Sequence, residues 1–336
     1  MAIQTNAQNT FTAKGIREDL TSIVALIDPQ ETPFISNIGE GKPAKQTKHE
    51  WQTQALAATS LTNWALEGDD SPNAAAATDR VRLYNICGIS RKVGSVTRTM
   101  RAVEVAGISD EYANQEMLKA IELRRDMEVM SLNNNKYLAG STTTVRQAAG
   151  LAAYITNTDW TGSGSTITAF TSATGDGSDT WNLAGVTTRA LSLTTLNGCM
   201  ATTNVAGGKP NLLLLSPTQK TNFSNLTLNS SLGGAAQVRF NSNTVKAMPL
   251  IGTVDTWMSN FGTLDVASNV QMAADTSFEN KTAFLVQTDK AGISYLDRMQ
   301  TIPLAKTGDS DKFMVITEWT LQVDAPKAHA ALFALT

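Results

Sequence analysis

The chain has 336 residues, of which 42% are hydrophobic and 17% are charged, and its formal net charge is -3. This length exceeds that of a typical single-core domain, so we expect two or more subdomains. Proteins that act through tight nucleic-acid binding usually carry a basic excess, so the near-balanced charge argues against that class and leaves a loose contact with DNA.

The cysteine content and the N-terminal residues indicate the cellular compartment in which the chain folds. Cys87 and Cys199 are too few to hold a secreted fold together and too far apart to form a metal knuckle. The N-terminus lacks the layout of a signal peptide, and the longest apolar run, at 212–215, is too short to span a bilayer. We therefore expect a soluble chain with no membrane partner, assembled in a reduced intracellular environment.

Residues 1–40 mix polar stretches with a short apolar segment at 20–27, followed by Pro29 and Pro33. Prolines interrupt helices and favour extended backbone at the residue before them. This pattern predicts an N-terminal arm that takes its order from neighbouring molecules.

Alternating side chains predict two strands, at 47–57 and from Val81 onward, with a polar tip at 61–79 between them. The second strand is expected to place its apolar residues on one face, with Asn85 interrupting the row. They are Val81, Leu83, Cys87, Ile89 and Val93. The ribbon would be on the order of 35 Å long or longer. Because an isolated ribbon is marginally stable, it should lie either on its own domain or on the next subunit.

A long helix is predicted at about 109–132, because Ser109 can cap it and Asp110 and Glu111 favour its first turn. Its length would be roughly 36 Å. Its apolar face should consist of Ala113, Met117, Leu118 and Ile121. Pairs of opposite charge three residues apart, including Glu122 with Arg125 and Arg125 with Glu128, indicate a solvated or intersubunit face.

The second half alternates helices and strands. Residues 133–182 are rich in Gly, Ser and Thr and read as loops around an ordered piece at 151–155, and a helical pattern follows at 183–200. The run 212–215 predicts a strand covered on both faces, and Ser216-Pro217 predicts the start of a helix. Further strands are predicted at 254–266, 283–288 and 313–323. The fold class is α+β.

Catalytic chemistry finds no support in the sequence. His49 and His329 are the only histidines, so we assign them structural roles in the ribbon and in a terminal strand. Nucleophile-elbow, dinucleotide and phosphate-loop motifs are absent, and Lys306-Thr307-Gly308 lacks the companion motifs of serine β-lactamases and predicts a turn. We expect no catalytic residue and no cofactor.

Two acidic clusters raise the question of a metal site. Glu67, Asp69 and Asp70 form one, and Asp309 and Asp311 form the other. Neither has the alternating ligands and closing glutamate of a calcium loop, so we expect no bound metal.

Basic residues gather between 80 and 101 without an intervening acid. They could pair with acids on another subunit or contact DNA, and we favour salt-sensitive self-assembly. The expected intersubunit contacts combine these residues with the hairpin tip, the ribbon and the long helix. They are Trp51, Glu67, Asp69, Asp70, Arg80, Arg82, Arg91, Lys92, Arg98, Arg101, Glu122 and Arg125.

The succession of arm, long hairpin, long charged helix, strand–helix region and closing strands resembles the major capsid, or major head, proteins of tailed bacteriophages. Their fold is the Johnson fold, also called the Hong Kong ninety-seven fold. The stretches that carry the resemblance are 28–34, His49-Glu50-Trp51, Glu67-Gly68, 110–128, 257–262 and 304–320. Asn260 and Val270 depart from the family pattern, in which an acid and an arginine are usual.

The resemblance divides the chain into four parts. They are the N-terminal arm (1–40), the extended β-hairpin loop (41–92), the peripheral domain with its spine helix (93–184 and 271–336), and the axial domain (185–270).

By the same resemblance, many copies would form the pentamers and hexamers of an icosahedral head that encloses double-stranded DNA, assembled in the host cytoplasm. No charged helical segment precedes the arm, which implies a separate scaffolding protein beside a portal. No lysine lies between Lys48 and Lys92, so the hairpin tip cannot supply the amine of an isopeptide cross-link. Noncovalent contacts or a cement (decoration) protein would strengthen the shell. The alternatives are an encapsulin-type nanocompartment shell and a hydrolase with an unrecognised site.

Overall fold

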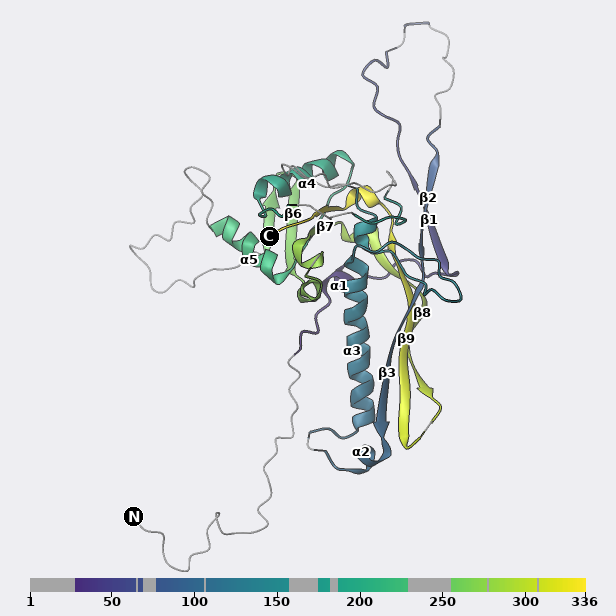
Figure 1. Ribbon diagram of the computed structural model, residues 1–336. Coiled ribbons are helices and arrows are strands. Elements are labelled where there is room, and N and C mark those ends of the chain that lie inside the picture. The colour runs from purple at the N-terminus through teal and green to yellow at the C-terminus, as the bar shows by residue number, and fades with distance from the viewer. Residues whose placement is uncertain are drawn as a thin grey trace, which may run out of the picture.

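The computed structural model describes residues 28–64, 66–68, 77–105, 107–156, 175–181, 187–228, 255–276, 278–306 and 308–336. Figure 1 shows three regions: a body of sheet and helices, a long leg below it, and a hairpin that projects away from both. None of the helices in these ranges combines the length and apolar character that crossing a bilayer requires.

The hairpin consists of β1 (Lys48–Gln54) and β2 (Arg80–Ile86), which pair antiparallel along their whole length. This confirms the predicted ribbon, but with strands of seven residues its regular part is only about 23 Å long. Trp51 lies opposite Leu83, and both are buried where the hairpin joins the body.

The strand pairing changes after β2. The single strand predicted from Val81 onward is therefore wrong, because this segment forms two separate strands, β2 and β3. β3 (Gly88–Thr97) leaves the hairpin and pairs with β9 (Ser310–Val323) in the leg. Cys87 separates the two strands and shifts the alternation, so that Ser90 is buried while Ile89 and Val93 are exposed. The predicted apolar face therefore ends at Cys87.

The leg is a three-stranded sheet in the order β3-β9-β8, with β8 at Ala291–Leu304. A short helix, α2 (Arg98–Ala102), follows β3. The predicted strand at 313–323 is confirmed within β9, whereas β8 was not predicted. The hairpin between β8 and β9 contains Lys306 and Gly308, in agreement with the predicted turn.

The long helix α3 (Glu111–Leu132) lies along one face of this sheet (Figure 1), where Leu123 packs against Phe313 and Val315. Asp110, rather than Ser109, is the N-cap, and its side chain accepts a hydrogen bond from the backbone N–H of Tyr112. The predicted apolar face is wrong. Its members are exposed or half-buried, and the buried positions are Leu123, Met127, Glu128, Ser131 and Leu132. These lie toward the C-terminal end, where the helix enters the body.

The body contains a five-stranded sheet in the order β10-β7-β4-β6-β5. Its strands are β4 (Leu212–Leu215), β5 (Thr256–Ser259), β6 (Gly262–Ser268), β7 (Ala283–Val286) and β10 (Ala330–Leu332). β4 lies at the centre and is buried throughout, as predicted. The predicted strand at 254–266 is instead the β5–β6 hairpin, because the chain turns at Asn260 and Phe261.

Helices α4 (Leu193–Val205) and α5 (Pro217–Leu228) accompany this sheet. Ser192 caps α4, so the helical pattern predicted before Leu193 is wrong for the described residues 187–192. Ser216 accepts a hydrogen bond from the backbone N–H of Gln219 and thereby confirms the predicted helix start. Short 3-10 helices complete the body. They are η1 (Leu151–Ala153), η2 (Val270–Ala274), η3 (Glu279–Lys281), η4 (Thr288–Lys290) and η5 (Pro326–Ala328).

One hydrophobic core joins the hairpin root, the body and the described part of the predicted arm. Residues 28–40 contain α1 (Pro33–Ile38), whose Phe34, Ile35 and Ile38 are buried in that core. This part of the arm is therefore ordered by its own chain. Residues 1–27 of the predicted arm lie outside the described residues.

Candidate functional site

Both histidines have structural partners. His49 Nε2 lies 2.9 Å from Gln322 Oε1 on β9. His329 precedes β10, and burial lowers the pKa of its imidazole to about 4, so it is neutral and accepts a hydrogen bond from the backbone N–H of Gln287. Burial raises the pKa of the Cys87 thiol to about 11. The described residues contain no cluster of three or more potential metal ligands.

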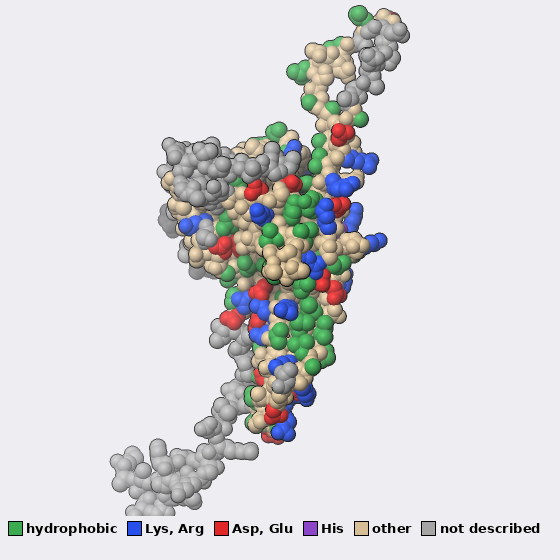
Figure 2. Space-filling view, turned by 45° about the vertical axis from the view of Figure 1, so that its right-hand side comes forward, with side chains coloured by type: hydrophobic (Ala, Val, Ile, Leu, Met, Phe, Trp, Pro, Cys, Tyr) green, Lys and Arg blue, Asp and Glu red, His purple; other side chains and the backbone are tan. Residues whose placement is uncertain are grey.

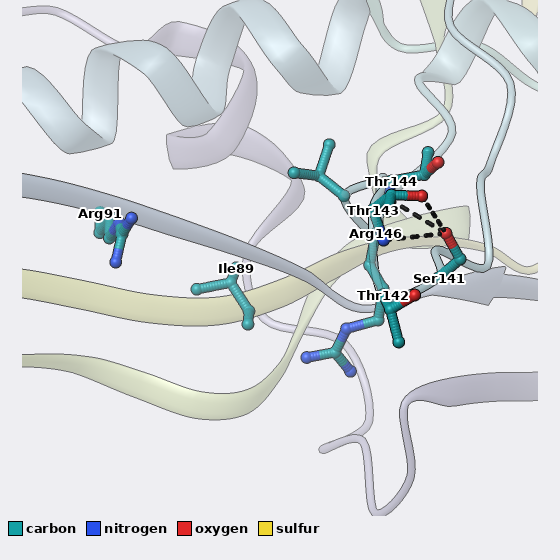
Figure 3. A pocket seen from close by; sticks show the side chains of 8 residues that line it. Ile89, Arg91, Ser141, Thr142, Thr143, Thr144 and Arg146 are labelled. Carbon is teal, nitrogen blue, oxygen red and sulfur yellow. Dashed lines mark hydrogen bonds between the residues drawn. The ribbon is translucent and has the colours of Figure 1, made fainter.

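A surface pocket lies between β3 and the turn at 141–146 (Figure 3). Ser141 Oγ accepts hydrogen bonds from the backbone N–H groups of Thr143 and Thr144, so its hydroxyl shapes the turn. Arg91 and Arg146 also line the pocket, but none of its lining residues is a histidine, cysteine or carboxylate. None of the lining residues can therefore serve these hydroxyls as a general base.

The most conspicuous surface feature is the hairpin beyond the ends of β1 and β2, which extends away from the body (Figure 1). Its large apolar side chains are almost completely exposed. The exposed fractions are 96% for Leu56, 92% for Leu61, 91% for Trp64 and 81% for Leu66. Because water-exposed apolar surface of this kind usually marks an interaction site, the tip is expected to be covered by another molecule.

The ribbon that carries the tip has two different faces. On one face, the buried pair Trp51 and Leu83 is followed outward by Thr53 opposite Val81, which is 48% exposed. The other face carries charged and polar pairs, such as Gln52 opposite Arg82. The apolar face therefore continues from the root beyond the body, so the hairpin is suited to lie on a surface with this side.

The leg presents a second apolar surface, the outer face of its sheet, on the side away from α3. Val93 of β3, Met314 of β9 and Ile302 of β8 are cross-strand neighbours in one row of this face. Val93 is 53% exposed, Ile302 37%, and Ile89 on the same face 48%. Figure 2 shows hydrophobic side chains gathered along the leg below the body.

Several predicted contact residues form ion pairs within their own chain. Lys92 lies 2.6 Å from Asp126 of α3, Arg98 lies 2.9 Å from Asp309, and Arg101 lies 2.5 Å from Asp311. Hydrogen bonds from Lys306 and Arg101 lower the pKa of the Asp311 carboxyl. The second acidic cluster is thus paired with cations of its own chain.

The helix residues are also engaged internally. Glu122 pairs with Lys119 at 2.7 Å, and Arg125 Nε donates to Gln271 Oε1, so the expected pairing of Glu122 with Arg125 is replaced. Trp51 is only 8% exposed and packs in the core of its own chain, which leaves little of its surface for a neighbouring molecule.

The remaining predicted residues lie on the hairpin and at the top of the leg. Arg82 lies 3.7 Å from Glu50, and Glu67 is exposed at the tip. Arg80 and Arg91 are exposed and have no ion-pair partner among the residues described. Asp69 and Asp70 lie outside the described residues.

Sequence reasoning missed the apolar residues of the tip, and it did not predict that the face carrying Val93 would be an exposed face of the leg sheet. Leu56, Leu61 and Trp64 interrupt a stretch rich in polar turn residues, and this interruption was the available signal. The outer face gave no comparable signal, because the row of Val93, Met314 and Ile302 depends on pairing between three strands far apart in the sequence.

The fold is that of capsid shells. The capsid asymmetric unit of cyanophage A-1(L) is 14% identical with a TM-score of 0.63, covering 96% of this chain and 97% of that one. The capsid of Myoviridae phage XM1 is 13% identical with a TM-score of 0.54, covering 96% and 100%. The SrpI encapsulin from Synechococcus elongatus is 10% identical with a TM-score of 0.56, covering 98% and 96%. At these identities the likeness establishes the fold alone.

Membership of a family follows from the sequence itself. A comparison with curated proteins gives no match. The sequence model of the SU10 major capsid protein family, however, matches residues 3–336. The chain therefore belongs to the SU10 major capsid protein family, whose members are structural proteins of phage heads and not enzymes.

Proposed function

We propose that copies of this chain form the pentamers and hexamers of an icosahedral head, with the hairpin of each copy lying on the outer sheet face of an adjacent copy. The observation that carries the proposal is the exposed apolar tip. Leu61 and Trp64 are more than nine-tenths exposed on a projecting hairpin, and burying them against a second apolar surface removes both from water.

The division into parts supports this arrangement. We assign residues 1–40 as the N-terminal arm, 41–92 as the extended loop, 93–184 with 271–336 as the peripheral domain, and 185–270 as the axial domain. The five-stranded sheet draws β7 and β10 from the third of these segments and β4, β5 and β6 from the fourth, so the axial and peripheral parts share one sheet. This shared sheet would fix the two parts relative to each other in every copy.

Ion pairs formed by the charged residues would contribute to the strength of the contact between copies. Arg80 on the hairpin and Arg91 at the top of the leg are exposed and available to acids on a neighbouring copy, whereas Arg82 lies 3.7 Å from Glu50 of its own chain. Exposed ion pairs weaken as salt screens them, so assembly should be salt-sensitive. With a net charge of -3, contact with the enclosed double-stranded DNA would be loose. A separate scaffolding protein, a portal and a cement protein are further proposed partners, and assembly is proposed in the host cytoplasm.

A single substitution at the tip tests the proposal. Trp64→Asp removes the largest exposed apolar group and places a charge where burial is proposed, so we expect a folded chain that forms no shells. Gln52→Asp provides a matched control, because it adds the same charge on the polar face of the same hairpin. Circular dichroism reports folding, and negative-stain electron microscopy counts shells.

The expected result is shells from the parent chain and from Gln52→Asp, and none from Trp64→Asp. The proposal fails if the parent chain, with its scaffold partner present, yields only small particles under all assembly conditions. Shells formed equally well by Trp64→Asp would overturn the role of the tip.

A further inference from the structure

Arg91 is a charged residue among apolar neighbours on the outer face of the leg sheet. It lies on β3 between Ile89 and Val93, which point to the same face because each is two residues away along the strand. Its cross-strand partner on β9 is Ile316. The side chain of Arg91 is exposed, and it has no ion-pair partner in the part of the chain that the structure describes. This cation therefore lacks a compensating charge where the face is otherwise suited to contact another molecule.

The pocket beside this residue combines apolar and basic groups. Its lining includes the exposed side chains of Ile89 and Val145 together with Arg91 and Arg146 (Figure 3). Arg146 lies 3.5 Å from Glu318 of β9, so this cation has an acid within its own chain. The pocket has a volume of about 430 Å³, which is within the range of pockets that enclose small ligands. It can therefore take in side chains of another molecule, next to a cation that they could neutralise.

Covering this surface would place a demand on the molecule that covers it. In the proposed assembly, the hairpin tip of an adjacent copy covers Val93, and Arg91 is the next residue on the same face. A guanidinium that loses its water costs free energy unless an opposite charge or hydrogen bonds replace the lost hydration. The covering segment should therefore present a carboxylate at this point.

The hairpin tip carries an apolar side chain and a carboxylate in succession. Leu66 is 81% exposed, and Glu67 beside it is exposed and forms no ion pair with the residues described. Gly68 has a φ of +83°, in the left-handed region that favours glycine, so the chain turns directly after Glu67. The tip thus offers the two kinds of group, apolar and acidic, that complement the pocket.

The spacing along the two segments is compatible with this match. Residues two apart on a strand are separated by about 7 Å, which is the distance expected between Arg91 and Val93. Trp64 and Glu67 are three residues apart, and three residues of extended chain span up to about 10 Å. A tip that places Trp64 on Val93 can therefore reach Arg91 with Glu67.

We propose that Glu67 of one copy pairs with Arg91 of an adjacent copy in the pocket beside β3, where Leu66 fills the apolar part. This inference rests on the proposed function, because it assigns a residue pair to the contact between the tip and the outer sheet face. Hydrophobic contact is non-directional, so it does not by itself fix where on the face the tip lies. An ion pair between two defined residues fixes the register, since every other placement leaves both charges uncompensated.

Charge reversal in the full chain tests the pair. Glu67→Arg and Arg91→Glu each bring like charges together, so the protein concentration needed for shell assembly should rise at least about 10-fold. The double variant Glu67→Arg/Arg91→Glu restores opposite charges and should return this concentration toward that of the parent chain. The matched control is Glu67→Arg/Arg80→Glu, which alters another exposed arginine and should not restore assembly. Circular dichroism checks folding, and negative-stain electron microscopy counts shells.

The pairing is overturned if Glu67→Arg forms shells at the parent concentration, or if the double variant assembles no better than the control. When the parent chain forms shells and Trp64→Asp does not, either result contradicts only the pairing and leaves the proposed function intact. If the parent chain forms no shells, sedimentation velocity decides the question. Small assemblies that both single variants lose and the double variant regains would support the pair, and a parent chain that stays monomeric would contradict both proposals.

Discussion

At the scale of single residues, buried polar groups fix how the segments join. Asn85 shows this most clearly. Its side chain donates to the carbonyl of Leu321 at 2.8 Å and to that of Ala149 at 3.2 Å, and its Oδ1 accepts from the backbone N–H of Ala149 at 2.8 Å. It therefore joins the hairpin root to β9 and to the loop before η1.

The sequence showed Asn85 only as an interruption of an apolar row. Its position in a strand was predictable, because alternation is a local property. Its structural role was not predictable. The backbone groups to which it bonds belong to Ala149 and Leu321, which are distant in sequence and come close to Asn85 only once the strands have paired. The same reason explains why Glu128 was expected in a surface charge pair and is instead buried.

Replacing Asn85 tests this role. Asn85→Leu keeps the volume but removes the side-chain hydrogen bonds to four backbone groups, which belong to Ile86, Ala149 and Leu321, so the free energy of unfolding should fall by about 3 kcal/mol or more. Asn204→Leu makes the same change at an exposed position of α4 and should have little effect. Denaturant unfolding measures both variants. Equal stability of the two would contradict the joining role of Asn85.

At the scale of elements, local patterns identified the strands, and long-range pairing decided their extent. The run at 212–215 and the helix start at Ser216-Pro217 were predictable, because burial on both faces and capping are encoded within a few residues. The break at Cys87 was not, because it exists only where β2 leaves β1 and β3 meets β9. The exposed faces of β3 and α3 were wrongly predicted for the same reason.

The hairpin tip can be removed without disturbing its root, since Gln54 and Arg80 are cross-strand partners. Replacing residues 55–79 by an Asn-Gly turn should leave thermal stability nearly unchanged and abolish shell formation. A Gly/Ser linker of the original length should also abolish it, because the apolar residues and not the length of the loop are required. Calorimetry and electron microscopy provide the readouts. Shells formed with the Gly/Ser linker would contradict the account.

At the scale of the whole molecule, the chain combines a well-packed core with apolar surfaces that lack cover among its described residues. The α+β class and the order of arm, hairpin, helix and closing strands were predictable, because each is read along the chain. The assignment of strands to sheets was not predictable, because β7 and β10 belong to the body sheet although they lie in the segment that was expected to form the peripheral domain. The tip and the outer sheet face are then the two surfaces that an assembled shell should bring together.

Electron cryomicroscopy of shells assembled from the parent chain tests this central claim most directly. The account predicts that the hairpin tip of each copy, with Leu61 and Trp64, lies against the sheet face of an adjacent copy that carries Val93, Met314 and Ile302. A reconstruction in which the tip points into solvent, or contacts only its own chain, would contradict it.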